Sequence, residues 1–191
     1  MVMDLNNYFY ESAHIKKAFI DNNQSLLEDV VQMCIDCFNN WSKILIAGNW
    51  WSAADAQHRA AEFMGRYKLE RNPLPAIALT TDTSNLTAVA NDYSFDDVFS
   101  RQIEWLGKIG DIFIGISTSG NSTNVIKAIE VCKKKWILTI ALLGKWGWEI
   151  KDLVDVSLVV PSDNTPRIQE CHQTIYHTIC EEVEKNIFKK E

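Results

Sequence analysis

The sequence predicts an α/β protein, a three-layer sandwich around a five-stranded parallel sheet with a pair of helices ahead of it. Five short runs rich in apolar and β-branched residues are separated by helix-length segments. The runs are apolar almost throughout, which is typical of strands buried on both faces and covered by helices. With 191 residues, 47% of them hydrophobic, residues 1–191 are expected to form a single domain around one core.

The first 40 residues are predicted to form the helix pair, and residues 41–191 the α/β core. A break between the two helices is expected at Asp21, Asn22 and Asn23, because Asn and Asp favour turns and helix caps.

In the core, helix-length segments separate the predicted strands. The predicted strands are 43–48, 76–79, 111–117, 138–144 and 156–161. The predicted helices are 53–67, 85–91 with 95–106, 122–135 and 166–189, the last opened by a proline suited to a first turn. Ligands of open α/β sheets bind at the carboxyl ends of the strands, so the residues that follow each strand are the candidates for chemistry.

Composition excludes several partners. The formal net charge is -6 and no basic run is longer than Lys133–Lys135, which argues against nucleic acid as a partner. No apolar run approaches the roughly 18 residues of a membrane span, and the N-terminus lacks the layout of a signal peptide. Five scattered cysteines indicate reduced thiols rather than a disulfide framework, so a cytoplasmic protein is predicted.

A hydroxyl-rich turn follows the third strand. In the segment STSGNS (117–122), hydroxyl groups surround a glycine, and a serine stands where a helix is expected to start. Such a nest of O–H and N–H donors at a helix start suits a phosphate group. The alternative is an ordinary serine-rich turn with a capped helix. The segment matches neither the P-loop nor the dinucleotide-binding pattern.

Two helices carry residues that suit a metal or a base. His58, Glu62 and Arg66 follow one another at intervals of four, so His58 and Glu62 share one helix face. They form a candidate metal or base site, although such a pair is more often a solvated surface pair. The last helix adds Gln169, His172 and His177. The default for His177, flanked by apolar residues, is a core histidine.

From about residue 40 to the end, the chain carries in order the patterns GNxxSAADAQHxAAExxGRY, AIALTTDTS, NDYSFDDVFSRQIE, GISTSGNSTNVIKAI and VVPSDNTPRIQECHQTIYH. Together these patterns resemble the phosphoheptose isomerases, the sedoheptulose 7-phosphate isomerases of the sugar isomerase (SIS) domain group. It implies a flavodoxin-like SIS domain in a homotetramer with active sites at subunit interfaces. It also implies conversion of sedoheptulose 7-phosphate to D-glycero-D-manno-heptose 7-phosphate, for lipopolysaccharide or capsule heptose in bacteria.

The resemblance also implies roles for single residues. The phosphate cradle would consist of Ser52, Ser117, Thr118, Ser119 and Ser122. The sugar would be bound by Asn49, Arg66, Asp92 and Gln169. Glu62 and His177 would be the acid/base pair that moves a proton from C1 to C2 through an enediol. The zinc ligands would be His58, Glu62, Gln169 and His177.

The chain departs from that family at its tryptophans. The family carries two glycines where this chain has Trp50 and Trp51. Glycine or another small or polar residue is expected at positions 41, 136, 146 and 148, and a small residue at 105. This concentration of one residue type indicates an altered sequence. Three interpretations of the loop stay open: indoles turned outward with reduced activity, indoles forming a wall of the ligand pocket, or indoles packed against a neighbouring subunit.

Other functions are compatible with the same fold. One is a SIS-fold regulator that grips a replication initiator protein, and another is a sugar-phosphate sensor. The presence of the whole acid/base and ligand set favours the enzyme. Because Gln169 and His177 lie eight residues apart, about 12 Å along one helix, we expect a complete metal site to draw on more than one chain.

Overall fold

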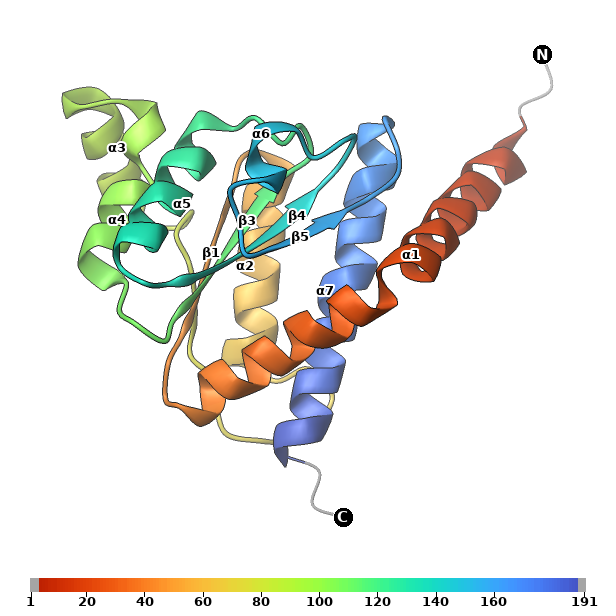
Figure 1. The fold of residues 1–191 in the computed structure, drawn as a ribbon, viewed down its shortest axis with the longest axis horizontal. Coiled ribbons are helices and arrows are strands. Elements are labelled where there is room, and N and C mark those ends of the chain that lie inside the picture. Colours follow the sequence, from red (N-terminus) through yellow and green to blue (C-terminus); the bar gives the residue numbers. More distant parts are fainter. Residues whose placement is uncertain (1–3, 189–191) are drawn as a thin grey trace.

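The sheet has the predicted class and strand number. The computed structural model describes residues 4–188. Its strands are β1 (Ile44–Gly48), β2 (Ala76–Ala78), β3 (Ile112–Ser117), β4 (Leu138–Leu143) and β5 (Val156–Val159). All neighbouring pairs are parallel, in the order β2-β1-β3-β4-β5 (Figure 1). Each strand lies within the apolar run that predicted it, so the five-stranded parallel sheet is confirmed.

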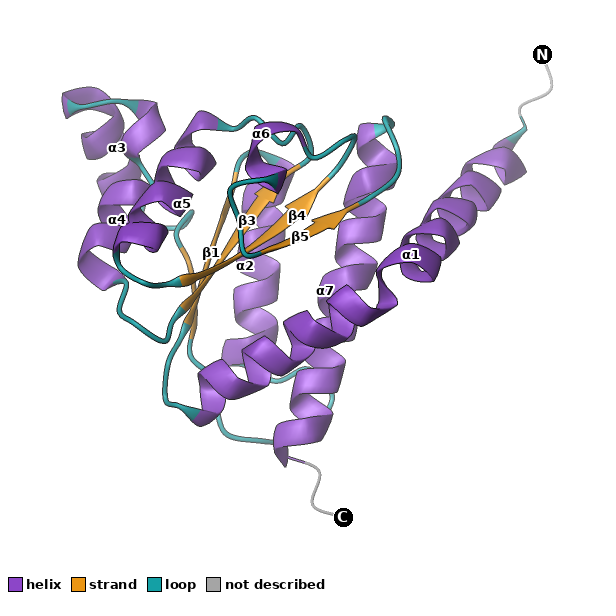
Figure 2. Cartoon of the chain, in the orientation of Figure 1, coloured by secondary structure: helices purple, strands orange, loops and turns teal. Residues whose placement is uncertain are grey.

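The helices separate the strands as expected (Figure 2). They are α1 (Leu5–Asn39), α2 (Trp51–Met64), α3 (Thr83–Asp92), α4 (Ser100–Leu106), α5 (Thr123–Lys134), α6 (Trp148–Lys151) and α7 (Thr165–Phe188), with a 3₁₀ turn over Phe95–Asp97 before α4. The short α6 was not predicted. Within residues 4–188, no helix combines the length and the apolar character that crossing a bilayer requires.

The predicted N-terminal helix pair is wrong, because α1 is one continuous helix of 35 residues. The side chains expected to break it bond within it instead. Asp21 pairs with Lys17 at 2.5 Å, and the amide groups of Asn22 and Asn23 each donate at 2.8 Å to a carbonyl four residues back. Such bonds are compatible with an unbroken helix.

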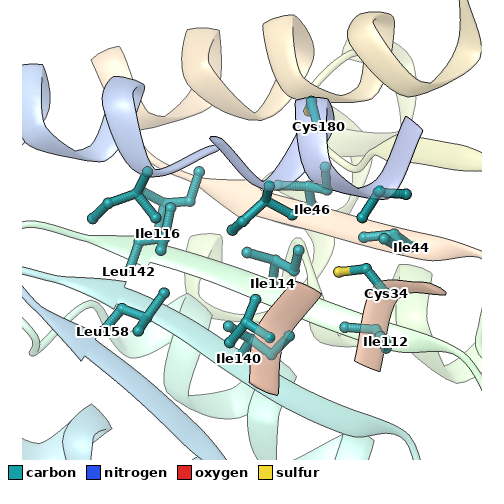
Figure 3. Packing of buried hydrophobic residues seen from close by; sticks show 14 of the residues in the cluster. Cys34, Ile44, Ile46, Ile112, Ile114, Ile116, Ile140, Leu142, Leu158 and Cys180 are labelled. Carbon is teal, nitrogen blue, oxygen red and sulfur yellow. The ribbon is translucent and has the colours of Figure 1, made fainter. Parts of the chain in front are cut away.

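The core forms two buried clusters, one on each face of the sheet. Strand residues alternate between them, since successive side chains point to opposite faces. Figure 3 shows one set, which includes Ile44, Ile46, Ile114 and Leu142, and this set packs with α1, α2 and α7. The other set, such as Leu45 and Phe113, packs with the helices α3 to α6. The predicted three-layer sandwich is therefore confirmed.

The strand order places a crevice between the ends of β1 and β3. From β1 the chain moves to β2 on one side, then returns to β3 on the other, which is the arrangement where open α/β sheets bind ligands. Gly48 ends β1 at this point. A Cβ on Gly48 would lie 2.7 Å from the Cβ of Ser52, so glycine lets α2 begin directly at the crevice.

Candidate active site

The hydroxyl nest forms where β3 meets α5. The Oγ of Ser117 lies 2.9 Å from that of Ser122 and 3.4 Å from that of Ser119. Ser122 precedes α5, but its side chain makes no capping hydrogen bond to the helix, which leaves first-turn N–H groups for an anion. Gly120 has φ +72°, and a Cβ there would lie 2.3 Å from the carbonyl oxygen of Gly147. The turn thus requires glycine.

A pocket of about 430 Å³ opens over this nest, a size that suits a small ligand. Seven of the predicted substrate residues line it: Asn49, Ser52, Ser117, Thr118, Ser119, Ser122 and Gln169. Trp50, Trp51, Ile116, Thr165 and Pro166 complete the lining.

Sequence reasoning missed the residue that orients Asn49. The side-chain amides of Asn49 and Asn124 exchange two hydrogen bonds of 2.9 Å, which tie the end of β1 to α5. Asn124 stands inside the quoted GISTSGNSTNVIKAI pattern, but an asparagine in a helical stretch gives no sign of a partner 75 residues away. The pair fixes the Asn49 side chain at the pocket.

The second cluster joins α2 to α7. The Nε2 of His58 lies 3.0 Å from the Oε1 of Glu62, and the Nε2 of His177 lies 4.0 Å from the same oxygen. One possible ligand atom from each of the three side chains lies within 4.8 Å of the others, so these residues of a single chain could hold a metal ion. Two imidazoles and a carboxylate are donors that zinc accepts.

His177 is suited to bind in its neutral form. Burial lowers its pKa, as does the neighbouring His58, against the opposing charge of Glu62. A neutral imidazole is the form that ligates a metal or accepts a proton. His177 is only partly buried, so the core-histidine expectation does not describe it. The fully buried histidine is His172, whose Nε2 lies 3.0 Å from the carbonyl oxygen of Leu143.

Two predicted sugar ligands lie outside the pocket of this chain. Arg66 is exposed and lies 3.8 Å from Glu70, while Asp92 ends α3 and accepts a hydrogen bond from the amide of Asn91. Gln169 lies in the pocket with the nest. It lies eight residues, about 12 Å along α7, from His177, while the other three predicted zinc ligands form the cluster.

The two tryptophans of the first loop stand at the rim of the pocket. Trp50 is 87% exposed and Trp51 is 69% exposed, and both contribute to the lining. The indoles are therefore turned largely outward. Trp50 has φ 55° and ψ -123°, a conformation that an L side chain strongly disfavours.

Fold and pocket together define a class. An all-parallel α/β sheet with a hydroxyl-lined pocket at its switch point is the arrangement of a SIS-domain protein, and the family model for the SIS domain matches residues 7–144.

Similar proteins identify the family within the SIS-domain class. The phosphoheptose isomerase of Sulfurimonas denitrificans is 54% identical over 187 residues, covering 94% of this chain and 96% of its own. That of Helicobacter pylori is 51% identical over 174 residues, 91% of each chain. The solved phosphoheptose isomerase of Neisseria gonorrhoeae superposes with a TM-score of 0.89 at 42% identity, covering 95% of this chain and 97% of its own. The Francisella tularensis structure gives 0.91 at 35% identity, covering 95% and 96%. The chain belongs to the phosphoheptose isomerase family and is an enzyme, an aldose–ketose isomerase.

Proposed function

We propose that the chain converts sedoheptulose 7-phosphate to D-glycero-D-manno-heptose 7-phosphate, as a homotetramer, in the synthesis of heptose for bacterial surface polysaccharides. One observation carries the proposal: the same two helices, α2 and α7, line the pocket over the hydroxyl nest and carry the His58–Glu62–His177 cluster. Ser52 and His58 belong to α2, and Gln169 and His177 belong to α7. A ligand anchored in the nest can thus extend along this helix pair towards the cluster.

The spacing suits a long sugar phosphate. His58 stands six positions after Ser52, which is about 9 Å along α2, and Gln169 is about 12 Å from His177 along α7. From the phosphorus to C1 of an extended ketoheptose 7-phosphate there are about eight bonds, or ~10 Å at roughly 1.2 Å per bond. The phosphate in the nest would thus bring C1 and C2 to Glu62. A three-carbon sugar phosphate would not reach.

The chain's own residues have distinct tasks in this reaction. Glu62 removes the proton from C1, the enediol forms, and the proton returns at C2. His177, neutral at physiological pH, exchanges a proton with the substrate oxygens. Asn49 and Gln169 orient the sugar, and the nest fixes its phosphate. Zinc, when bound by His58, Glu62 and His177, would supply a Lewis acid that polarises the carbonyl. Gln169, the fourth implied ligand, would reach such an ion only from a different chain.

The state of the cysteines supports a proposal about the cellular compartment of the enzyme. All five are buried and unpaired, since no disulfide joins them in the described part of the chain. We propose a reducing compartment, the cytoplasm.

The test is turnover of sedoheptulose 7-phosphate by the full chain and two variants. Glu62→Gln removes the base but keeps its shape, so the rate is expected to fall by about 100-fold or more while thermal unfolding stays unchanged. Ser119→Ala removes a phosphate donor, so it is expected to weaken binding of the phosphorylated sugar and leave affinity for the unphosphorylated ketose as it was. Undiminished turnover in Glu62→Gln would show that Glu62 is not the base. A parent chain that binds the phosphate without turnover would instead be a sensor.

A further inference from the structure

One contact in the cluster belongs to none of the roles assigned so far. The hydroxyl of Tyr176, on α7, lies 2.7 Å from the Nδ1 of His58, on α2. The Tyr176 side chain is fully buried, and its ring meets the His58 ring edge-on with centroids 5.4 Å apart. Since the Nε2 of His58 contacts Glu62 at 3.0 Å, each ring nitrogen has one partner. The imidazole is thereby held in one orientation.

The orientation decides which nitrogen is offered to a ligand. A neutral imidazole carries one proton, and a nitrogen that binds a metal must be the unprotonated one. Nε2 is the nitrogen that faces Glu62 and the cluster. If Nε2 is to bind, the proton must lie on Nδ1, where the Tyr176 oxygen can accept it. With no ion bound, the same hydroxyl can donate to Nδ1 while Nε2–H donates to Glu62.

The Tyr176 hydroxyl can serve in both states. A tyrosine hydroxyl can donate one hydrogen bond and can also accept one. Tyr176 therefore acts as a neutral hydroxyl that both donates and accepts, and it adds no charge to the cluster.

We propose that Tyr176 is a positioning residue, whose hydroxyl occupies Nδ1 of His58 and so presents Nε2 to Glu62 and His177. The part of this inference that concerns metal affinity depends on the zinc site proposed above. The part that concerns the tautomer and orientation of His58 does not.

The experiment compares Tyr176→Phe with Tyr67→Phe in the full chain. Phe keeps the buried ring of Tyr176 and removes only its hydroxyl. Tyr67 is a matched control, because its ring lies 5.8 Å from that of His177 and its hydroxyl makes no hydrogen bond to either histidine among the described residues. Zinc affinity is measured by competition with a chromophoric chelator. We expect it to fall by roughly 10- to 100-fold in Tyr176→Phe and to stay unchanged in Tyr67→Phe.

Ring-nitrogen chemical shifts of His58, from ¹⁵N-labelled parent protein, give the second readout. They are expected to show Nε2–H in the metal-free chain and Nδ1–H in the zinc-loaded chain. Equal zinc affinity in the parent and Tyr176→Phe, or zinc bound through Nδ1, would overturn the proposal. If the parent binds no zinc, the proposed metal site fails, and the metal-free spectrum alone decides: one fixed tautomer of His58 supports the role of Tyr176, and an averaged pair of tautomers overturns it. The parent spectrum serves even if Tyr176→Phe fails to fold.

An independent observation concerns the tryptophans. Five non-glycine residues of residues 4–188 have positive φ, and four of them are Trp41, Trp50, Trp136 and Trp148. All seven tryptophans are 56–96% exposed, although tryptophan is on average highly buried, and none belongs to a buried cluster. The φ and ψ of Trp50 are the mirror image of an extended residue, a region that glycine alone enters readily.

We infer that the four positive-φ positions are built for glycine and that the working chain carries glycine at all seven tryptophan positions, as would follow if its cell reads one codon as glycine. Four positions show it by their backbone. Trp51, Trp105 and Trp146 join the group by residue type and exposure. With glycine at 50 and 51, the backbone at the start of α2 would be free to approach the phosphate over the nest.

Peptide mass mapping of the protein isolated from its own cell is the direct test. Glycine at the seven positions supports the inference, and tryptophan there overturns it. A second test compares the tryptophan-containing chain with its Trp41→Gly, Trp50→Gly, Trp136→Gly and Trp148→Gly variants. Each is expected to raise the melting temperature by roughly 2–4 °C, since a strained positive φ is relieved. The matched control Trp105→Gly lies inside α4 and is expected to lower it. No gain at any of the four would equally overturn the inference. Neither measurement depends on the proposed reaction.

Discussion

At the scale of single residues, His172 couples stability to pH. Burial lowers its pKa to about 4, against the hydrogen bond to Leu143 and together with the charge of Arg59. In the unfolded chain its pKa is about 6.5. Between those values the unfolded state binds a proton that the folded state does not, so stability is complete above pH 6.5 and declines as pH falls to 4. At 1.36 kcal/mol per unit, the loss is about 3 kcal/mol.

Urea unfolding at pH 7 and pH 4.5 checks this prediction in the parent and in His172→Gln. Gln keeps a donor towards the Leu143 carbonyl and cannot titrate. Glu184 also has a lowered pKa and destabilises the fold at low pH, but it does so in both proteins. The smaller decline expected in His172→Gln thus isolates the histidine. An equal decline in the two proteins would contradict the assignment.

At the scale of elements, the sequence predicts what local periodicity encodes. Buried parallel strands appear as apolar runs, so all five strands were located within one or two residues. The four-residue α6 is too short to show a helical period. The false break in α1 has a different cause: Asn and Asp favour turns, but here the apolar face continues through Phe19 and Leu27, which are buried against the body of the protein. Tertiary packing overrides local preference.

In the site, too, contacts between residues near in sequence were predictable and contacts between distant residues were not. The nest was predictable, because its hydroxyls are adjacent in sequence, and the His58–Glu62 pair follows from helical spacing. The partners of these groups lie far along the chain. Tyr176 is 118 residues from His58 and resembles an ordinary core aromatic in its helix. Residue type and spacing alone do not predict such contacts.

A buried ion pair that holds the loop after α2 could not be predicted from the sequence either. Glu184, on α7, accepts hydrogen bonds from the backbone amides of Tyr67, Lys68 and Leu69 and from the guanidinium of Arg71. Glu184 and Arg71 are both almost fully buried, so each compensates the desolvation of the other. From the sequence, a glutamate in a helix rich in Glu and Lys is expected at the surface. The pair instead anchors this loop at the end of the helix that carries His58 and Glu62.

At the scale of the whole molecule, α1 is incompletely covered. Its N-terminal part extends away from the body of the protein (Figure 1). Leu5, Tyr8, Phe9 and Tyr10 are each more than half exposed there. An exposed apolar patch of this kind is typical of a surface that binds another protein, and it supports the proposed homotetramer. Arg66 and Asp92, which face solvent in one chain, would then be available to the pocket of a neighbour.

Breaking the assembly is expected to affect metal binding and sugar binding differently. His58, Glu62 and His177 belong to one chain, so they are expected to retain zinc in a dissociated chain. Arg66 and Asp92 of one chain, in contrast, could no longer reach the pocket of its neighbour. Phe9→Asp places a charge in the α1 patch. We expect a smaller species by analytical ultracentrifugation, an unchanged helical content, zinc still bound, and isomerase activity reduced by about 10-fold or more. Ile109→Asp, at an equally exposed apolar residue in the loop before β3, is the matched control and should change none of these.

A dissociated Phe9→Asp chain with full activity would show that one chain holds a complete site. Loss of zinc together with activity would show that a second chain supplies a ligand, as the distance between Gln169 and His177 along α7 requires if both bind the same ion.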